Sequence, residues 1–205
     1  VDPHSTNPYQ LTEADRTVIG NTTPKFSGGF GLNATYKGFD MSMFFNFMYD
    51  FDVLNANKIM LTTWADNKEN NFLMDIASDK RWRNFDDMGN EIRYSPEVLA
   101  EFNKNATMWN PTSIGRPICM SYAVEDGSFL RLNSATLGYT LPSVWTKKVG
   151  LSKVRFYVSG NNLFTLTGYS GYDPEVNIAT GLTPNIDYDR YPRSRTYTFG
   201  AQLTF

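Results

Sequence analysis

The chain has 205 residues, 15% of them aromatic, with 19 basic against 21 acidic side chains and a net charge of −2. This balance argues against a nucleic-acid surface, and the single cysteine excludes an internal disulfide framework and a site built from several cysteines. The mean hydropathy is −0.40, and no run approaches the roughly 18 apolar residues of a transmembrane helix.

The start of the chain predicts a loop followed by a β-hairpin. Residues 1–23 are rich in Pro, Asn, Thr and Asp, which favour turns. Over 24–53 apolar residues recur at every second position, and Gly38 predicts a tight turn between two strands. The apolar face of the second strand is expected to hold Phe39, Met41, Met43, Phe45, Phe47, Tyr49, Phe51 and Val53.

The length of this hairpin suggests a membrane. Eight apolar positions on one face span far more than the roughly 5–6 residues of an ordinary strand. A tilted strand that crosses a bilayer needs about 9–11 residues, and both arms reach that length. The alternative is a long amphipathic hairpin in a soluble β-sandwich.

Residues 54–126 break the alternation and form a long, charged loop that contains Trp64, Trp82 and Trp109. Ser95, followed by Pro96 and Glu97, predicts a short helix that runs to about residue 102. A loop of this length counts against a compact soluble domain, but it suits the extracellular side of an outer-membrane barrel. The three tryptophans are candidates for stacking on sugars or anchoring a protein partner, with packing inside the loop as the alternative.

Strand character returns over 127–166. The leucines before Asn133 and those after Thr136 fall on opposite parities, which predicts a β-bulge between them. Arg131 is then expected to point away from the apolar face. The segment 143–153, SVWTKKVGLSK, predicts a basic turn, and the following strand leads to Asn161.

A second loop, 167–193, is rich in Tyr, Asp, Gly and Pro. Its candidate contacts to a substrate or partner are Tyr169, Tyr172 and Asp173. The carboxylate pairs Asp173/Glu175 and Asp187/Asp189 could serve acid–base chemistry or calcium, but carboxylates in such loops more often cap turns. The lone His4 lies in the first loop, so Ser/His/Asp catalysis is not expected, and we predict neither an enzyme nor a metal or cofactor.

The terminal strand, 194–205, alternates over its whole length and stops on an aromatic residue. Thr198, Gly200, Leu203 and Phe205 resemble the C-terminal signal of bacterial outer-membrane β-barrels, which the assembly machinery reads.

Several segments, in the same order, resemble the C-terminal part of SusC/RagA-type TonB-dependent outer-membrane transporters. They are IGNTTPKF (19–26), YKGFDMSMFFNF (36–47), DGSFLRLNSATLGYTLP (126–142), VSGNNLFTLTGYSGYDPEVN (158–177) and YPRSRTYTFGAQLTF (191–205). The long loop matches little. The resemblance implies a 22-stranded barrel with an N-terminal plug, import energised by TonB and a SusD-like lipoprotein that caps the outside.

The expected fold is therefore an all-β, antiparallel segment of a transmembrane barrel with about five strands. Five strands cannot close, and open edges in a bilayer would leave backbone groups unpaired at several kcal/mol each. We therefore expect the chain to be the tail of a longer barrel, or else to be completed by other chains. The plug and the TonB-contacting segment are expected upstream. The C-terminus is predicted to be periplasmic, which makes 1–23, 54–126 and 167–193 extracellular.

The predicted function is import of oligosaccharides, or else oligopeptides, across the outer membrane of a Gram-negative Bacteroidetes-type cell, with a SusD-like lipoprotein, TonB, membrane lipid and the assembly machinery as partners. A non-transporting barrel in a larger envelope complex is the main alternative, and a soluble binding module is a third.

Overall fold

The computed structural model describes residues 16–63, 71–77, 79–111, 119–175, 184–188 and 190–205. They form two compact units. The sheet unit consists of the described residues up to 53 together with 126–175 and 192–205, and the loop unit consists of those in 54–125 and 184–191. Among the described residues no helix is long and apolar enough to cross a membrane.

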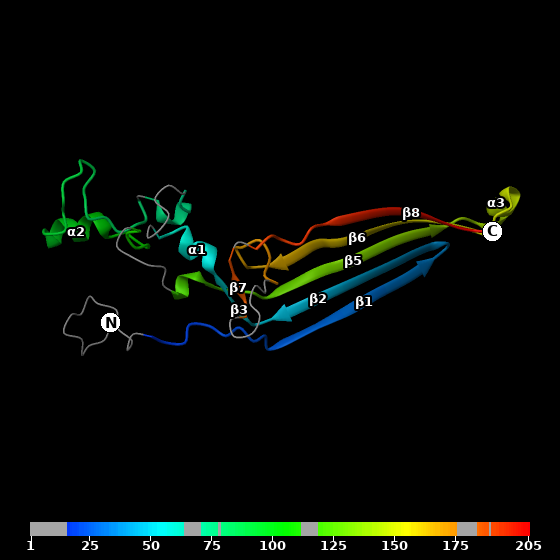
Figure 1. The fold of residues 1–205 in the computed structure, drawn as a ribbon, viewed down its shortest axis with the longest axis horizontal. Helices are drawn as coiled ribbons and strands as arrows, with labels where there is room; N and C mark the ends of the chain where they lie inside the picture. The colour runs from blue at the N-terminus through cyan, green and yellow to red at the C-terminus, as the bar shows by residue number, and fades with distance from the viewer. Residues whose placement is uncertain (1–15, 64–70, 78, 112–118, 176–183, 189) are drawn as a thin grey trace. The chain divides into compact units, whose positions relative to one another are not determined.

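The sheet unit is built on five antiparallel strands that lie side by side (Figure 1). Their order is β1-β2-β5-β6-β8, so neighbours in the sheet follow one another along the chain. The strands have 9 to 15 residues, which covers the length predicted for a tilted membrane strand. Their bounds are β1 Phe26–Tyr36, β2 Phe39–Tyr49, β5 Phe129–Thr140, β6 Lys153–Thr167 and β8 Thr196–Thr204.

Short connections lie at one end of this sheet and long ones leave from the other. At the first end Lys37 and Gly38, both with positive φ (46° and 91°), make the predicted tight turn between β1 and β2. The same end holds the β5–β6 connection, with α3 (Ser143–Thr146) and the 3₁₀ turn η4 (Lys147–Val149). From the opposite end the chain makes the long excursions between β2 and β5 and between β6 and β8.

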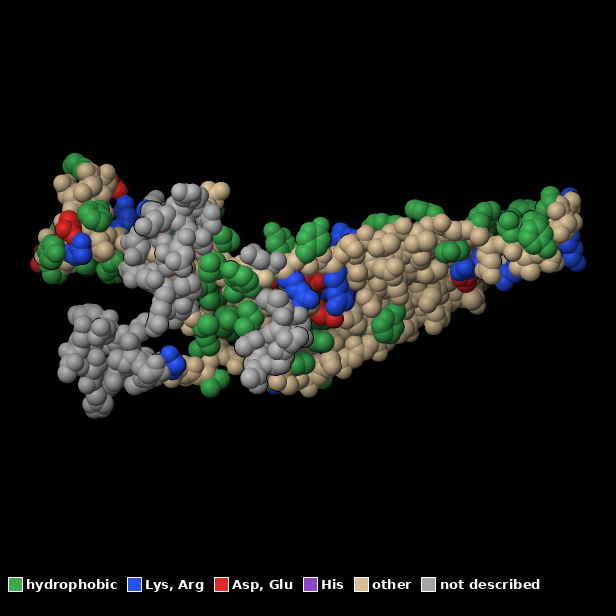
Figure 2. Space-filling view, viewed as in Figure 1, with side chains coloured by type: hydrophobic (Ala, Val, Ile, Leu, Met, Phe, Trp, Pro, Cys, Tyr) green, Lys and Arg blue, Asp and Glu red, His purple; other side chains and the backbone are tan. Residues whose placement is uncertain are grey.

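The alternating sequence gives the sheet two unlike faces. Paired residues of neighbouring strands share a face of the sheet. One such row on the apolar face runs across four strands and consists of Phe30, Phe45, Leu132 and Phe164. The Phe30 and Phe45 rings stack with centroids 4.9 Å apart. On this apolar face most of the large side chains are exposed or half-buried. The sheet surface turned toward the viewer in Figure 2 is mostly polar side chain and backbone.

The predicted β-bulge is confirmed. The register between β2 and β5 shifts after Leu132, where Asn133 is the extra residue, and the register between β5 and β6 shifts at the same place. Asn162 on β6 takes a left-handed conformation there (φ 53°). The bulge keeps Leu132 and Leu137 on one face although they fall on opposite parities, and Arg131 points to the other face as expected.

The second strand is shorter than the sequence indicated. We expected its apolar face to continue to Val53, but β2 ends at Tyr49 because Asp50 adopts a left-handed conformation (φ 58°). The amide of Asp50 donates a hydrogen bond to Ser128 Oγ instead of the ladder (2.8 Å). Phe51 and Val53 are buried, and both would collide with a side chain at Gly127.

Outside the five-stranded sheet the chain forms short elements that the alternation could not reveal. A three-stranded sheet, β4-β3-β7, consists of Val124–Asp126, Asp52–Asn55 and Ile186–Asp187, with β3 and β7 parallel. The helices and 3₁₀ turns are α1 Ala56–Met60, η2 Met74–Ile76, α2 Pro96–Asn103 and η3 Ser121–Ala123. The predicted helix after Ser95 is confirmed as α2, with Pro96 at its first turn.

Candidate functional site

The polar face of the sheet carries an ion pair that crosses an entire strand. Arg155 on β6 reaches over β5 to Asp40 on β2, with Nε donating to Oδ1 (2.9 Å) and Nη2 to Oδ2 (2.5 Å). This two-pronged geometry is the strong form of an Arg–carboxylate pair. Gly138 lies between the two strands, and a Cβ there would come within 2.6 Å of Arg155 Nε and Asp40 Oδ1. The glycine therefore makes room for the pair.

A second charged cluster joins the sheet to the segment that follows β6. Arg131 on β5 is 2% exposed and binds Asp173 through Nη2. Its Nη1 lies 3.2 Å from Glu175 Oε2, an ion-pair distance without hydrogen-bond geometry. Glu175 in turn binds Arg193 Nη2 (2.9 Å) through Oε1. Figure 2 shows basic and acidic side chains gathered at two places over the sheet, one near each end.

This Arg131 cluster, made of Arg131, Asp173, Glu175 and Arg193, accounts for the first of the two predicted carboxylate pairs. Of the second pair, Asp187 is buried and Asp189 lies outside the described residues. Asp173 also accepts from the amide of Glu175 (2.9 Å), so it closes a turn as well as an ion pair. The guanidinium of Arg131 lies 5.3 Å from the centroid of the Phe129 ring. Within the described ranges no cluster of three or more His, Cys, Asp and Glu side chains is arranged to hold a metal ion. The arrangement fixes the loop 168–175 to the sheet.

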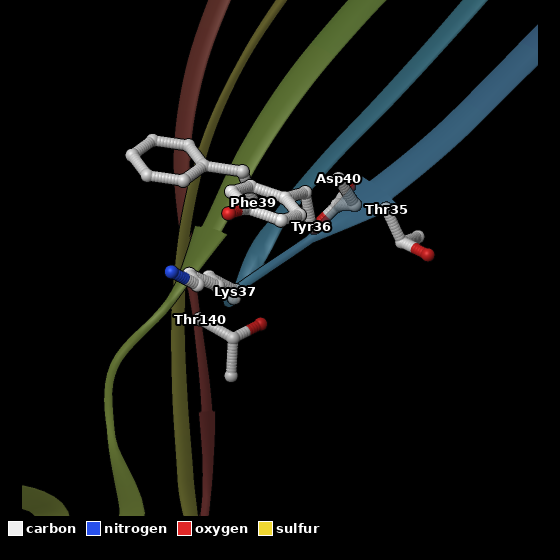
Figure 3. A pocket seen from close by; sticks show the side chains of 7 residues that line it. Thr35, Tyr36, Lys37, Phe39, Asp40 and Thr140 are labelled. Carbon is white, nitrogen blue, oxygen red and sulfur yellow. The ribbon is translucent and has the colours of Figure 1, made fainter.

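One open pocket lies at the β1–β2 turn and has a volume of about 360 Å³ (Figure 3). It is lined by Thr35, Tyr36, Lys37, Gly38, Phe39, Asp40 and Thr140. Its carboxylate, Asp40, already binds Arg155, and Lys37 Nζ lies 5.1 Å from the centroid of the Tyr36 ring. Asp40 is therefore not free to bind a ligand in this pocket.

The three candidate contacts in the second loop differ sharply in accessibility. Tyr169 is buried, and its ring covers Gly171, where a Cβ would overlap it. Asp173 is buried in the Arg131 cluster. Tyr172 is largely exposed. Of the three, only Tyr172 presents its side chain to an incoming partner.

The loop tryptophans also differ in their accessibility. Trp109 packs edge-on against Tyr122 (5.1 Å between centroids) and donates from Nε1 to the Thr62 carbonyl (3.2 Å). Burial, together with the hydrogen bond that Tyr122 donates to Asp75, raises the pKa of Tyr122 above its usual range. Trp109 thus belongs to the packing of the loop unit, whereas Trp82 is exposed. Trp64 lies outside the described residues.

The four residues of the proposed assembly signal lie on or beside β8, which pairs with β6. Thr198 and Gly200 occupy positions on the polar face, and Leu203 lies on the apolar face opposite Val154. A Cβ on Gly200 would overlap the ring of Tyr157, so this glycine also has a packing role. Phe205 follows the end of the strand and is 88% exposed.

Sequence reasoning missed two features of this unit. The link from Glu175 to Arg193 joins residues whose contact no local pattern indicates. Trp145, in the basic turn, was not singled out, although it is largely exposed at the end of the sheet. The combination of Trp and Lys in a turn between two amphipathic strands was the available signal.

Comparison with known proteins identifies the class. The chain is 35% identical over 202 residues to TonB-dependent receptor P3 of Formosa agariphila, a match that covers 96% of this chain and 18% of that protein. It is 36% identical over 88 residues to TonB-dependent receptor SusC of Bacteroides thetaiotaomicron, covering 41% of this chain and 8% of SusC. No family model matches. The chain is homologous to TonB-dependent receptors over nearly its whole length.

The fold points to the same proteins. The RagAB peptide importer in its open-open state superposes with a TM-score of 0.71 and 25% identity, over 96% of this chain and 19% of that one. The five-stranded sheet therefore matches part of a TonB-dependent receptor barrel. The resemblance to SusC/RagA-type receptors predicted from the sequence is confirmed, and this chain spans about a fifth of the length of these relatives.

Proposed function

We propose that this chain forms part of the barrel wall of a TonB-dependent importer in the outer membrane of a Gram-negative bacterium. The observation that carries the proposal is a sheet of long strands with unlike faces, in a chain homologous to such receptors over 96% of its length. The five strands are the C-terminal strands of a 22-stranded barrel. The plug and the segment that contacts TonB belong to the part of the receptor upstream of these residues.

The apolar face contacts lipid and the polar face lines the lumen. Exposed aromatic and aliphatic side chains cover the first face, from Phe30 on β1 to Phe199 on β8. The second face carries the Asp40–Arg155 pair and the Arg131 cluster, which are ion-paired and therefore better suited to the lumen than to hydrocarbon. The outer edges of β1 and β8 pair with barrel strands outside this chain, because unpaired edges do not persist in a bilayer.

The C-terminus lies in the periplasm, which places the long connections on the extracellular side. There the loop unit, with 1–23 and 167–193, contacts the substrate or a SusD-like lipoprotein. The exposed side chains Trp82, Phe85, Met88 and Tyr94 support this role, since exposed aromatic and Met residues are enriched in protein interfaces. Thr198, Gly200, Leu203 and Phe205 act as the assembly signal.

The transported substrate is an oligosaccharide or an oligopeptide. The resemblance of the sequence to SusC-type receptors favours an oligosaccharide. The structural similarity to the RagAB peptide importer favours an oligopeptide. Uptake of each class by cells that produce the full-length receptor distinguishes them.

The loop role can be tested by a deletion designed on the structure. Arg81 and Met108 form an isolated bridge, and the amide of Trp82 donates to the Met108 carbonyl (2.8 Å). The two segments run parallel, so the chain has to cross over between them, and residues 83–106 are therefore replaced by a flexible Gly/Ser linker of about a dozen residues. We expect a receptor that still reaches the outer membrane but binds less lipoprotein or imports less substrate.

The matched control is a conservative change inside the same excised segment. Lys104→Gln removes only an exposed ion pair with Glu101 (2.5 Å) and should leave both readouts unchanged. Unchanged uptake and unchanged lipoprotein co-purification in the deletion variant would reject the proposed role of this loop.

A further inference from the structure

The connection between β5 and β6 ends in a rigid helical turn rather than a flexible loop. The 3₁₀ turn η4 continues directly from α3, and Gly150 closes the pair in a left-handed conformation (φ 77°). The Gly150 amide donates to the Lys147 carbonyl (3.2 Å) and the Leu151 amide donates to the Thr146 carbonyl (3.1 Å). These two bonds form a Schellman motif. We call residues 143–151 the Trp145 turn.

The outer surface of the Trp145 turn is apolar and open. Val144, Trp145 and Val149 are 70%, 60% and 71% exposed, whereas Thr146 between them is buried. Trp145 on α3 and Val149 on η4 are thus both exposed within one short helical segment. Leaving a tryptophan and two valines in water is unfavourable unless something covers them.

The same turn carries positive charge. Lys147 and Lys148 are exposed in its last residues, and no acidic side chain occurs between Ser143 and Leu151. An exposed apolar surface beside a pair of lysines is the pattern of a segment that lies on an anionic membrane surface.

The position of the turn agrees with this pattern. It connects directly to strand residues of the apolar face, from Tyr139 before it to Phe156 after it. The Phe39 and Tyr139 rings on that face lie 4.5 Å apart at the same end of the sheet. Aromatic side chains gather where a membrane protein meets the headgroup layer.

We infer that the Trp145 turn binds the membrane surface, with Val144, Trp145 and Val149 inserted at the level of the lipid headgroups and Lys147 and Lys148 paired with anionic phospholipid. This inference rests on the proposed orientation of the apolar face toward lipid. The occupant is phospholipid rather than a protein because the exposed surface combines a small apolar patch with two exposed lysines beside a lipid-facing strand end. The turn anchors the β5–β6 hairpin at the periplasmic surface.

The test uses the full-length receptor, with Cys119 replaced by Ser, in lipid nanodiscs that contain phosphatidylcholine with or without phosphatidylglycerol. A fluorescent probe is attached to one introduced cysteine at Val149→Cys. Leu137→Cys, on the apolar face of β5, reports the bilayer, and Val98→Cys on α2 reports water. Quenching by spin-labelled lipid is compared with quenching by iodide in solution.

We expect lipid quenching at position 149 to exceed that at position 98 by at least about threefold, with the nitroxide at the headgroup more effective than one deep in the acyl chain. Lys147→Gln with Lys148→Gln should reduce the preference for phosphatidylglycerol by at least about threefold. A double change to Arg should preserve the preference.

The outcomes separate this inference from the proposed function. Lipid quenching at 137 with iodide quenching at 149 places the turn in water and overturns the inference alone. Lipid quenching at 137 with neither quencher effective at 149 means that protein covers the turn, which also overturns it. Absence of lipid quenching at 137 refutes the proposed function itself.

Discussion

Replacing Arg131 by Met should release the loop 168–175 from the sheet. Arg131 is almost fully buried and faces two carboxylates, Asp173 and Glu175. Glu175 retains Arg193 as a partner, so the substitution leaves mainly Asp173 as a buried charge without a cation. Breaking a buried ion pair in this way costs about 3–5 kcal/mol.

The expected loss of free energy lies at the lower end of the range of about 3–5 kcal/mol. The Asp173 side chain is 11% exposed and keeps the backbone hydrogen bond from Glu175, so some of its charge stays solvated. A loss of about 3 kcal/mol in local opening free energy corresponds to roughly a hundredfold faster amide exchange. Hydrogen exchange measured by mass spectrometry on peptides covering 169–175 is the assay, with β8 peptides as an internal reference.

A double variant shows whether the charge is the cause. Arg131→Met combined with Asp173→Leu removes both members of the pair, and an apolar replacement of a buried ion pair is often nearly neutral. Most of the lost protection should return. If Arg131→Met alone leaves the exchange of 169–175 within a few-fold of the wild-type rate, the cluster does not hold this loop and the reasoning is wrong.

Three further perturbations address other parts of the molecule. Gly138→Ala should separate Arg155 from Asp40, because the new Cβ would lie 2.6 Å from Asp40 Oδ1. The variant should lose its heat-modifiable gel mobility at a lower temperature than the wild type. An unchanged temperature would contradict this prediction. The pKa of Tyr122 is raised in the folded protein, so its contribution to the free energy of unfolding is complete below the unfolded pKa near 10 and declines as the pH rises above that value. Proteolysis of the loop unit should therefore accelerate above about pH 10. The acceleration should be smaller in Tyr122→Phe. Phe205 is 88% exposed, so its deletion removes far less burial free energy than the roughly 1.5–3 kcal/mol of a fully buried Phe. A strong loss of membrane insertion would therefore indicate recognition by the assembly machinery. Normal surface levels would show that the motif is an ordinary strand end.

Alternation and turn chemistry were sufficient to predict the sheet. They indicated five strands, the turn at Gly38 and the bulge near Asn133, because each depends on neighbouring residues or on a period of two. The end of β2 could not be predicted in this way. Phe51 and Val53 continue the period without a break, and only the left-handed conformation of Asp50 and its bond to Ser128 turn the chain away.

The charged contacts were beyond the reach of local patterns. Arg131 and Asp173 are 42 positions apart, and Asp40 and Arg155 are 115 apart. The Asp40–Arg155 pair forms because the register of the sheet brings strands β2 and β6 into line across β5. Asp173 reaches Arg131 from the segment that follows β6. The short strands β3, β4 and β7 have two to four residues, too few for a period to be recognised.

The orientation of the sheet toward lipid is tested most directly at two adjacent phenylalanines of β2. Phe45 stacks on Phe30 on the apolar face, whereas the Phe44 ring lies on the polar face over Gly29. Each is replaced by Cys in the full-length receptor, without Cys119, and treated with a thiol reagent confined to the bilayer. The account predicts labelling of Phe45→Cys and protection of Phe44→Cys, with the pattern reversed for a water-soluble reagent that enters the lumen. Lipid-phase labelling of Phe44→Cys but not of Phe45→Cys would contradict it.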